Sequence, residues 1–165
     1  MKKWILIAIL VIFLAIGWTG GHLYQSTLQS QKDFENQGLN IVKEKEIFST
    51  IDNVDTYYGT NAYRIITGKN SKGEELIAWV PEEGEVITRK KSEGVSKEKA
   101  LEGLYSTLKN LYDDKNRDPK EIHSIKLGME DNTPIWEIIY IDNRSRLTYY
   151  RGLFETGQYW KFIRP

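Results

Sequence analysis

An unbroken apolar run opens the chain. Residues 4–18 read WILIAILVIFLAIGW, without one charged side chain. Continued to Tyr24, the run approaches the roughly 20 residues that a helix needs to cross a bilayer core of about 30 Å. Basic residues precede it and none follows until Lys32, a bias that keeps the N-terminus in the cytoplasm. We therefore expect residues 1–24 to form a single-pass anchor in the cytoplasmic membrane and the remainder to be extracytoplasmic, with the anchor residues Lys2, Lys3, Trp4, Trp18 and Tyr24.

A cleaved secretory signal has a similar pattern, because it also combines a short basic segment with an apolar run. Ala15-Ile16-Gly17 even fits an A-x-A-like cleavage site. The apolar segment continues through Trp18, however, and the amphipathic ring of a tryptophan suits the membrane interface. We favour the retained anchor and keep the cleaved signal as the alternative. Lipoprotein attachment is excluded, because the chain has no cysteine to acylate.

Two antiparallel meanders are predicted beyond the anchor. Apolar, β-branched and aromatic runs alternate there with short segments rich in Gly, Asn, Asp and Ser, a pattern typical of hairpins. The strands of the first meander are expected near 54–58, 62–68, 75–80 and 85–90. Those of the second are expected near 122–129, 134–141, 146–152 and 158–163. Gly73 and Gly84 lie in turns of the first meander, where a positive φ is often required.

A helix is predicted before each meander. The clearer helix covers 97–112, where Leu101, Leu104, Leu108 and Leu111 recur at helical spacing. Ser96 is a suitable N-cap for it. The first helix lies somewhere within 25–48 and is expected to be interrupted at Gly38. Its Gln- and Ser-rich beginning, residues 25–33, is interpreted as a stalk.

A helix with one apolar stripe beside a sheet with one apolar face predicts a two-layer α+β module. We expect two such modules in tandem, the first covering 34–92 and the second 93–165. The polar segment 90–94 is too short to be a long flexible tether, so the modules should touch. In strand 134–141 both faces are apolar. The face that does not pack on the helix is expected to pack on the neighbouring module, with an exposed partner surface as the alternative.

The two modules are interpreted as copies of one another. At an offset of 73 residues, 63–87 pairs with 136–160, and aromatic, isoleucine, asparagine and glycine positions coincide. In this alignment the run Ile65-Ile66 falls on Ile138-Ile139, and Gly84 falls on Gly157. The alternative is that any two hairpin meanders look alike at this level of identity.

Composition excludes several classes of function. Without Lys2 and Lys3 the chain has 21 basic and 23 acidic residues, which is not the basic excess of a nucleic-acid-binding protein. With no cysteine and only two histidines, His22 and His123, no metal site is predicted. The motifs of metalloproteases, serine hydrolases and P-loop proteins are absent from the sequence, so we expect no catalytic residues and no cofactor. Paired acids such as Glu82-Glu83 are interpreted as solvated turn residues.

Aromatic residues are the more informative excess, because Tyr and Trp often anchor protein interfaces. They also favour strands for ordinary packing reasons, which is the alternative interpretation. Neighbouring residues of a strand point to opposite faces, so one member of the Tyr149-Tyr150 pair should face away from its helix. The candidate partner-surface residues are Tyr149, Tyr150 and Trp160.

Several segments resemble a known family. They are VDTYYGTNAYRIITGKNSKGEELIAWVP in the first module, GVSKEKA at the start of the second helix and IWEIIYIDNRSRLTYYRGLFETGQ in the last meander. Together with the anchor and stalk, they resemble the TseB-like cell wall elongation regulators of Bacillus-type bacteria over nearly the whole chain. The resemblance implies PepSY-like modules with a cystatin-like fold and no enzymatic activity. It also implies binding of a membrane-anchored penicillin-binding transpeptidase at the outer face of the membrane during sidewall growth.

Two other functions stay open. PepSY-like modules are also compared with protease inhibitors and propeptides, but the candidate loops at 69–74, 82–84 and 142–145 are short for insertion into a protease cleft. A cell-wall glycan-binding module would use exposed Trp79 or Trp160 as stacking platforms.

Overall fold

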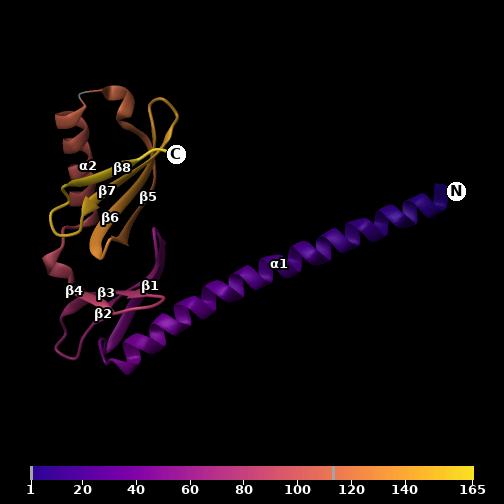
Figure 1. Cartoon of the computed structure of the whole chain (residues 1–165), viewed down its shortest axis with the longest axis horizontal. Coiled ribbons are helices and arrows are strands. Elements are labelled where there is room, and N and C mark those ends of the chain that lie inside the picture. The colour runs from indigo at the N-terminus through magenta and orange to yellow at the C-terminus, as the bar shows by residue number, and fades with distance from the viewer. Residues whose placement is uncertain (1, 113) are drawn as a thin grey trace. The chain divides into compact units, whose positions relative to one another are not determined.

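The computed structural model describes residues 2–112 and 114–165, without the side chains of residues 2–15, 23, 26–28, 30 and 31 (Figure 1). The chain divides into a compact unit from Gly38 to Pro165 and the segment before it, up to Gln37. Within the described part, the strands form two four-stranded antiparallel sheets. The predicted α+β class with two meanders is therefore confirmed.

The first helix, α1 (Lys2–Glu44), is continuous. The expected interruption at Gly38 is wrong, and the reason lies in packing. A Cβ atom at this position would overlap the side chain of Arg64, so glycine allows the helix and the first sheet to approach closely. From Gly38 onward α1 covers one face of the first sheet, where Val42 is buried with Ile66.

The predicted anchor and stalk both lie within α1. In the described part of the chain, no helix meets the length and apolarity that a membrane crossing requires. The side chains of Lys2, Lys3 and Trp4 lie outside the described residues, as does the apolar run up to residue 15. Trp18 and Tyr24 are exposed. The anchor therefore stays a prediction.

The first sheet has the strand order β1-β2-β3-β4. Its strands are β1 (Thr50–Tyr58), β2 (Ala62–Lys69), β3 (Glu75–Pro81) and β4 (Ile87–Lys90). The predicted strands agree with these bounds, except that β1 begins four residues earlier than expected. Gly73 and Gly84 have positive φ angles of 78° and 113°, which explains why glycine stands in these two turns.

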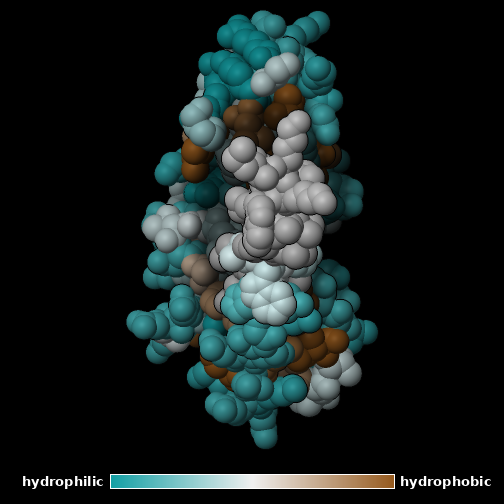
Figure 2. Space-filling model, turned by 90° about the vertical axis from the view of Figure 1, so that its right-hand side faces the viewer, coloured by the Kyte–Doolittle hydropathy of each residue, from teal (hydrophilic) through white to brown (hydrophobic). Residues whose placement is uncertain are grey.

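The second sheet has the strand order β5-β6-β7-β8. Its strands are β5 (Pro119–Glu130), β6 (Thr133–Asp142), β7 (Leu147–Leu153) and β8 (Tyr159–Ile163). Helix α2 (Lys97–Leu111) packs Leu104 and Leu108 against Ile138 and Tyr150. It begins as predicted, because the Ser96 side chain accepts a hydrogen bond from the Lys99 backbone N–H at 3.3 Å. Figure 2, which views the side away from α2, shows hydrophobic residues in its upper part, where this sheet lies.

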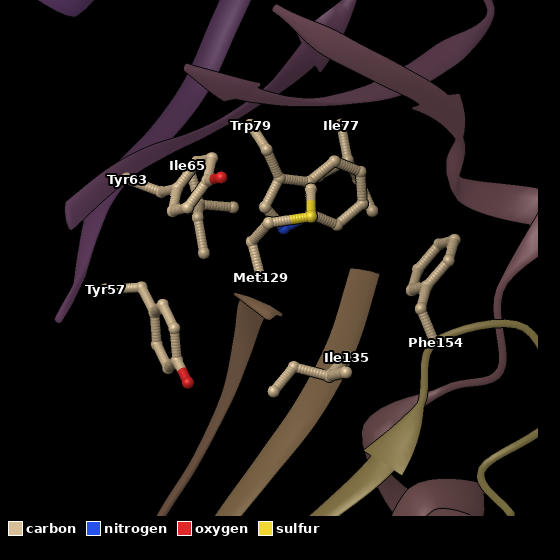
Figure 3. Packing of buried hydrophobic residues seen from close by; sticks show 8 residues of the cluster. All are labelled: Tyr57, Tyr63, Ile65, Ile77, Trp79, Met129, Ile135 and Phe154. Atoms are coloured by element: carbon tan, nitrogen blue, oxygen red, sulfur yellow. The ribbon is translucent and has the colours of Figure 1, made fainter. Parts of the chain in front are cut away.

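A third apolar cluster joins the two sheets (Figure 3). The face of the first sheet that points away from α1 carries Tyr63, Ile65, Ile77 and Trp79. The end of the second sheet packs onto this face with the side chains of Met129, Ile135 and Phe154. The rings of Trp79 and Phe154 meet edge to face, with centroids 5.4 Å apart. The expected contact between the modules is therefore confirmed.

The repeat has a different offset from the predicted one in its central hairpin. Lys69 faces Glu75 across β2 and β3, and Ile141 faces Leu147 across β6 and β7. The two hairpins are thus centred on positions 72 and 144, an offset of 72 rather than 73 residues. At the next turn the offset is 73, as predicted, because Gly84 and Gly157 both have positive φ.

The helix-covered faces confirm the offset of 72. Ile66 is buried in the cluster that includes Val42 of α1, and Ile138 is buried beneath α2. Ile66 therefore corresponds to Ile138, not to Ile139. Each copy has two consecutive isoleucines, so a slip of one residue preserves the apparent match, although it turns every side chain to the opposite face of the sheet.

Candidate binding surfaces and the junction between the sheets

A buried polar cluster lies where the two sheets meet. The Tyr57 hydroxyl, from the end of β1, donates to Glu130 and lies 3.1 Å from its Oε1 and 3.2 Å from Glu137 Oε2. The Thr60 backbone N–H and hydroxyl also donate to Glu130, at 3.2 and 2.9 Å. Arg151 lies 2.9 Å from Glu130 Oε1 and 3.0 Å from Glu137 Oε2. We call these five residues the junction cluster.

Two glycines make room for the junction cluster. A Cβ atom at Gly128 would lie 2.7 Å from the Tyr57 ring, closer than real Cβ contacts come. At Gly59 a Cβ atom would overlap both the Glu130 carboxylate and the Tyr57 ring. The turn between β1 and β2 therefore closes tightly around the carboxylate that it binds.

The charges of the junction cluster compensate one another. Burial raises the pKa of Glu130, but the hydrogen bonds from Thr60 and the Arg151 guanidinium outweigh this effect, so its pKa lies below the usual value. Burial, reinforced by Glu137, raises the pKa of the Tyr57 hydroxyl well above its usual range, so the hydroxyl remains a hydrogen-bond donor. Every carboxylate in the cluster is bound to Arg151, which suits a structural role better than acid or base catalysis.

A cleft of about 500 Å³ lies between the first sheet, the second sheet and the beginning of α2. Its apolar lining includes Ile77, Leu127, Trp136 and Phe154. Charged residues also line the cleft, and one of them, Lys91, pairs with Glu75 at 3.2 Å. A smaller hollow continues from it along Trp136, whose indole N–H donates to the Val95 carbonyl at 3.2 Å. Apolar walls with a few polar groups are typical of ligand-binding clefts.

The predicted partner-surface residues have three different environments. Tyr150 is fully buried beneath α2 and donates to the Gly157 carbonyl at 3.0 Å, so it cannot form part of a partner surface. Trp160 is half-buried and packs on the cluster between the sheets. Tyr149 lies on the face opposite α2 and is half-buried. Trp79 is fully buried, so it cannot stack on a glycan.

Among the residues that the structure describes, no group of three His, Cys, Asp or Glu side chains is arranged to hold a metal ion. His123 lies 3.9 Å from Glu121 on an exposed part of β5. The expectation of no metal and no cofactor stays a prediction.

Sequence reasoning missed the junction cluster. Its members come from four separate segments, and neither their spacing nor their composition indicates that they meet. One signal was present: a glycine follows Tyr57-Tyr58 directly in a hairpin turn that also contains Thr60 and Asn61. The cleft was missed for the same reason, because its lining comes from both sheets and from α2.

The comparisons with known proteins agree on one family. Residues 37–81 match the model of the cell wall elongation regulator TseB-like domain. These residues form a TseB-like domain. The predicted resemblance to this family is confirmed. Within the TseB-like domain lie the end of α1, the strands β1 to β3, and two residues of the junction cluster, Tyr57 and Thr60.

Similarity to one relative extends well beyond the TseB-like domain. The chain is 27% identical over 162 residues to the probable cell wall elongation regulator TseB of Bacillus subtilis (strain 168), covering 94% of this chain and 92% of that protein. The solved structure of the YpmB protein from Bacillus subtilis has the same fold, with a TM-score of 0.69 and 23% identity. That match covers 79% of this chain and 96% of the other chain.

Proposed function

We propose that this protein regulates cell wall elongation by binding another protein, without catalysing a reaction itself. The observation that carries the proposal is its similarity to the probable cell wall elongation regulator TseB of Bacillus subtilis along 94% of the chain. The geometry supports the binding role, because the junction cluster and the core between the sheets hold residues 38–165 as one unit with a cleft at its centre.

The proposed location is the outer face of the cytoplasmic membrane. Lys2 and Lys3 before the apolar run support a cytoplasmic N-terminus, and the run from Trp4 to Tyr24 supports a single crossing. An anchored protein meets other anchored proteins at high effective concentration, so a modest affinity for its partner suffices.

The proposed partner is a membrane-anchored penicillin-binding transpeptidase. The test is affinity purification of the full chain from chemically crosslinked membranes of its own cells. We expect to recover a transpeptidase of this class. The matched control is a chimera in which residues 1–37 precede an unrelated extracytoplasmic domain, because it keeps the predicted anchor and loses both sheets. Recovery of cytoplasmic proteins alone, or equal recovery with the chimera, would contradict the proposal.

A further inference from the structure

The second sheet has an apolar face that α2 does not cover. Successive residues of a strand point to opposite faces, and α2 packs on Ile138, Tyr140 and Tyr150. The ladder pairs Ile139 with Tyr149 and Ile141 with Leu147, and Tyr149 also pairs with Ile163. These residues therefore lie together on the other side, where Figure 2 shows hydrophobic residues. We call this the open face, formed by Ile139, Ile141, Leu147, Tyr149 and Ile163.

The first sheet shows what this type of face binds. With the offset of 72 residues, Tyr149 of the open face corresponds to Ile77 of the first sheet. Ile77 lies in the cluster between the sheets, on the face that receives Met129, Ile135 and Phe154. In the first copy, the face opposite the helix is thus occupied by the end of a β-sheet. In the second copy, only the beginning of the corresponding face, at Ile135, is covered in this way.

The open face is also continuous with the junction between the sheets. The next row of the ladder contains Glu137 and Arg151, both in the junction cluster, followed by Lys161 opposite Arg151. Lys161 is exposed, and Lys126, opposite Glu137, is half-exposed beside Asp55. A protein that covers the apolar row would therefore meet two ammonium groups at its border.

We propose that the open face binds the end of a β-hairpin of the partner protein, with apolar side chains at its tip and a carboxylate beside them. This inference rests on the proposed function, in which the partner is a penicillin-binding transpeptidase. The apolar side chains cover Ile139, Tyr149 and Ile163, and the carboxylate pairs with Lys161. The interaction repeats the contact that the second sheet makes with the first, where Glu130 is the carboxylate and Met129 and Ile135 are apolar.

The test measures binding of the full chain, in lipid nanodiscs, to the purified penicillin-binding transpeptidases of its own cells by biolayer interferometry. We expect Tyr149→Ser and Leu147→Lys each to weaken binding at least tenfold, because truncated interface anchors typically have effects of this size. The matched controls are Tyr105→Ser and Leu111→Lys on α2, which are 46% and 56% exposed and should bind like the unchanged protein. Thermal unfolding of each variant identifies any loss of folding.

A charge reversal tests the proposed carboxylate independently. We expect Lys161→Glu to slow association, with a larger effect at low salt than at high salt, because exposed charges mainly steer the encounter. If the unchanged protein binds and the open-face variants bind equally well, the inference is wrong and the proposed function stands. If the unchanged protein binds no transpeptidase, both are wrong.

A second copy of the chain is the competing occupant, and sedimentation of the same samples tests it. We expect no self-association that depends on Tyr149, because the sheet end that would dock is already buried against its own first sheet. A dimer that Tyr149→Ser abolishes, with transpeptidase binding unchanged, would overturn the inference.

Discussion

Tyr57 and Glu130 lie 73 residues apart in the chain and are joined by a hydrogen bond of 3.1 Å inside the protein. Tyr57 belongs to the first sheet and Glu130 to the second, so this bond crosses the junction. Apolar contact alone gives little directional preference, whereas a buried hydrogen bond has a preferred geometry. The bond therefore fixes how the end of the second sheet is seated on the first.

Removal of the Tyr57 hydroxyl should destabilise the protein. In Tyr57→Phe the ring keeps its packing while Glu130 and Glu137 lose a donor, so we expect the free energy of unfolding to fall by about 1–3 kcal/mol. Urea denaturation of residues 38–165 in the full chain measures the effect. Tyr58→Phe is the matched control, because its side chain is 69% exposed and should change stability by less than about 0.5 kcal/mol. Equal effects of the two substitutions would contradict the role of the bond.

Removal of Arg151 should have a larger effect. Arg151→Leu leaves two enclosed carboxylates without their cation, so we expect a loss of about 3–5 kcal/mol at pH 7. The loss should shrink at about pH 5, because an uncompensated buried carboxyl binds a proton more readily. Arg144→Leu is the control, since Arg144 pairs with Asp114 at 3.3 Å on the surface and should contribute less than about 1 kcal/mol. A deficit in Arg151→Leu that does not depend on pH would argue against this explanation.

Stability should decrease in acid. Burial raises the pKa of Asp142, but hydrogen bonds from Arg146 outweigh it, so the pKa lies below its usual value, as it does for Glu130. A carboxyl with a lowered pKa stabilises the folded state above the unfolded pKa of about 4 and loses this contribution as the pH falls through its folded pKa. Urea denaturation between pH 7 and pH 3 should therefore show decreasing stability below about pH 4, with a shallower decrease in Asp142→Asn. A slope unchanged in that variant would exclude Asp142 as a source.

Loss of the helix cap should destabilise α2. Ser96→Ala removes the side-chain acceptor of the Lys99 N–H, so we expect a loss of about 1 kcal/mol in urea denaturation. Ser106→Ala is the control, because Ser106 lies on the exposed side of α2 and accepts only a long hydrogen bond from Asn110 at 3.4 Å. If the two variants lose the same stability, the cap does not determine where α2 begins.

Removal of the predicted anchor should abolish function in cells. A secreted form that begins after Tyr24 keeps both sheets, but it loses the effective concentration that a membrane tether provides. We expect it to fail to restore normal cell length in a deletion strain, while the full chain succeeds at the same protein level. Full rescue by the secreted form would mean that the N-terminal segment serves only for export.

Local features of the fold followed from the sequence because their causes are local. Ser96 caps α2 through the residue three positions ahead, and Gly73 supplies the positive φ that its turn requires. The hairpins were recognisable from alternating strand and turn residues. By contrast, Gly38 looked like a helix breaker and instead accommodates Arg64, which lies on a different element and is distant in sequence.

The candidate site was less predictable because it depends on which face each strand turns toward its neighbours. The prediction that one member of the Tyr149-Tyr150 pair faces away from the helix was correct, since Tyr150 is buried beneath α2 and Tyr149 is on the open face. The sequence alone did not indicate which member that was. A repeat offset wrong by one residue would have assigned the faces incorrectly.

The junction cluster also affects how such a protein can be inherited or reassembled. Glu130, Glu137 and Arg151 belong to the second copy, yet Tyr57 and Thr60 of the first copy complete their hydrogen bonds. A gene rearrangement that moved either copy by itself would separate a charged group from its donors and expose Trp79 or Phe154. The duplicated halves are therefore expected to be exchanged between proteins as a pair, although each resembles a domain of its own.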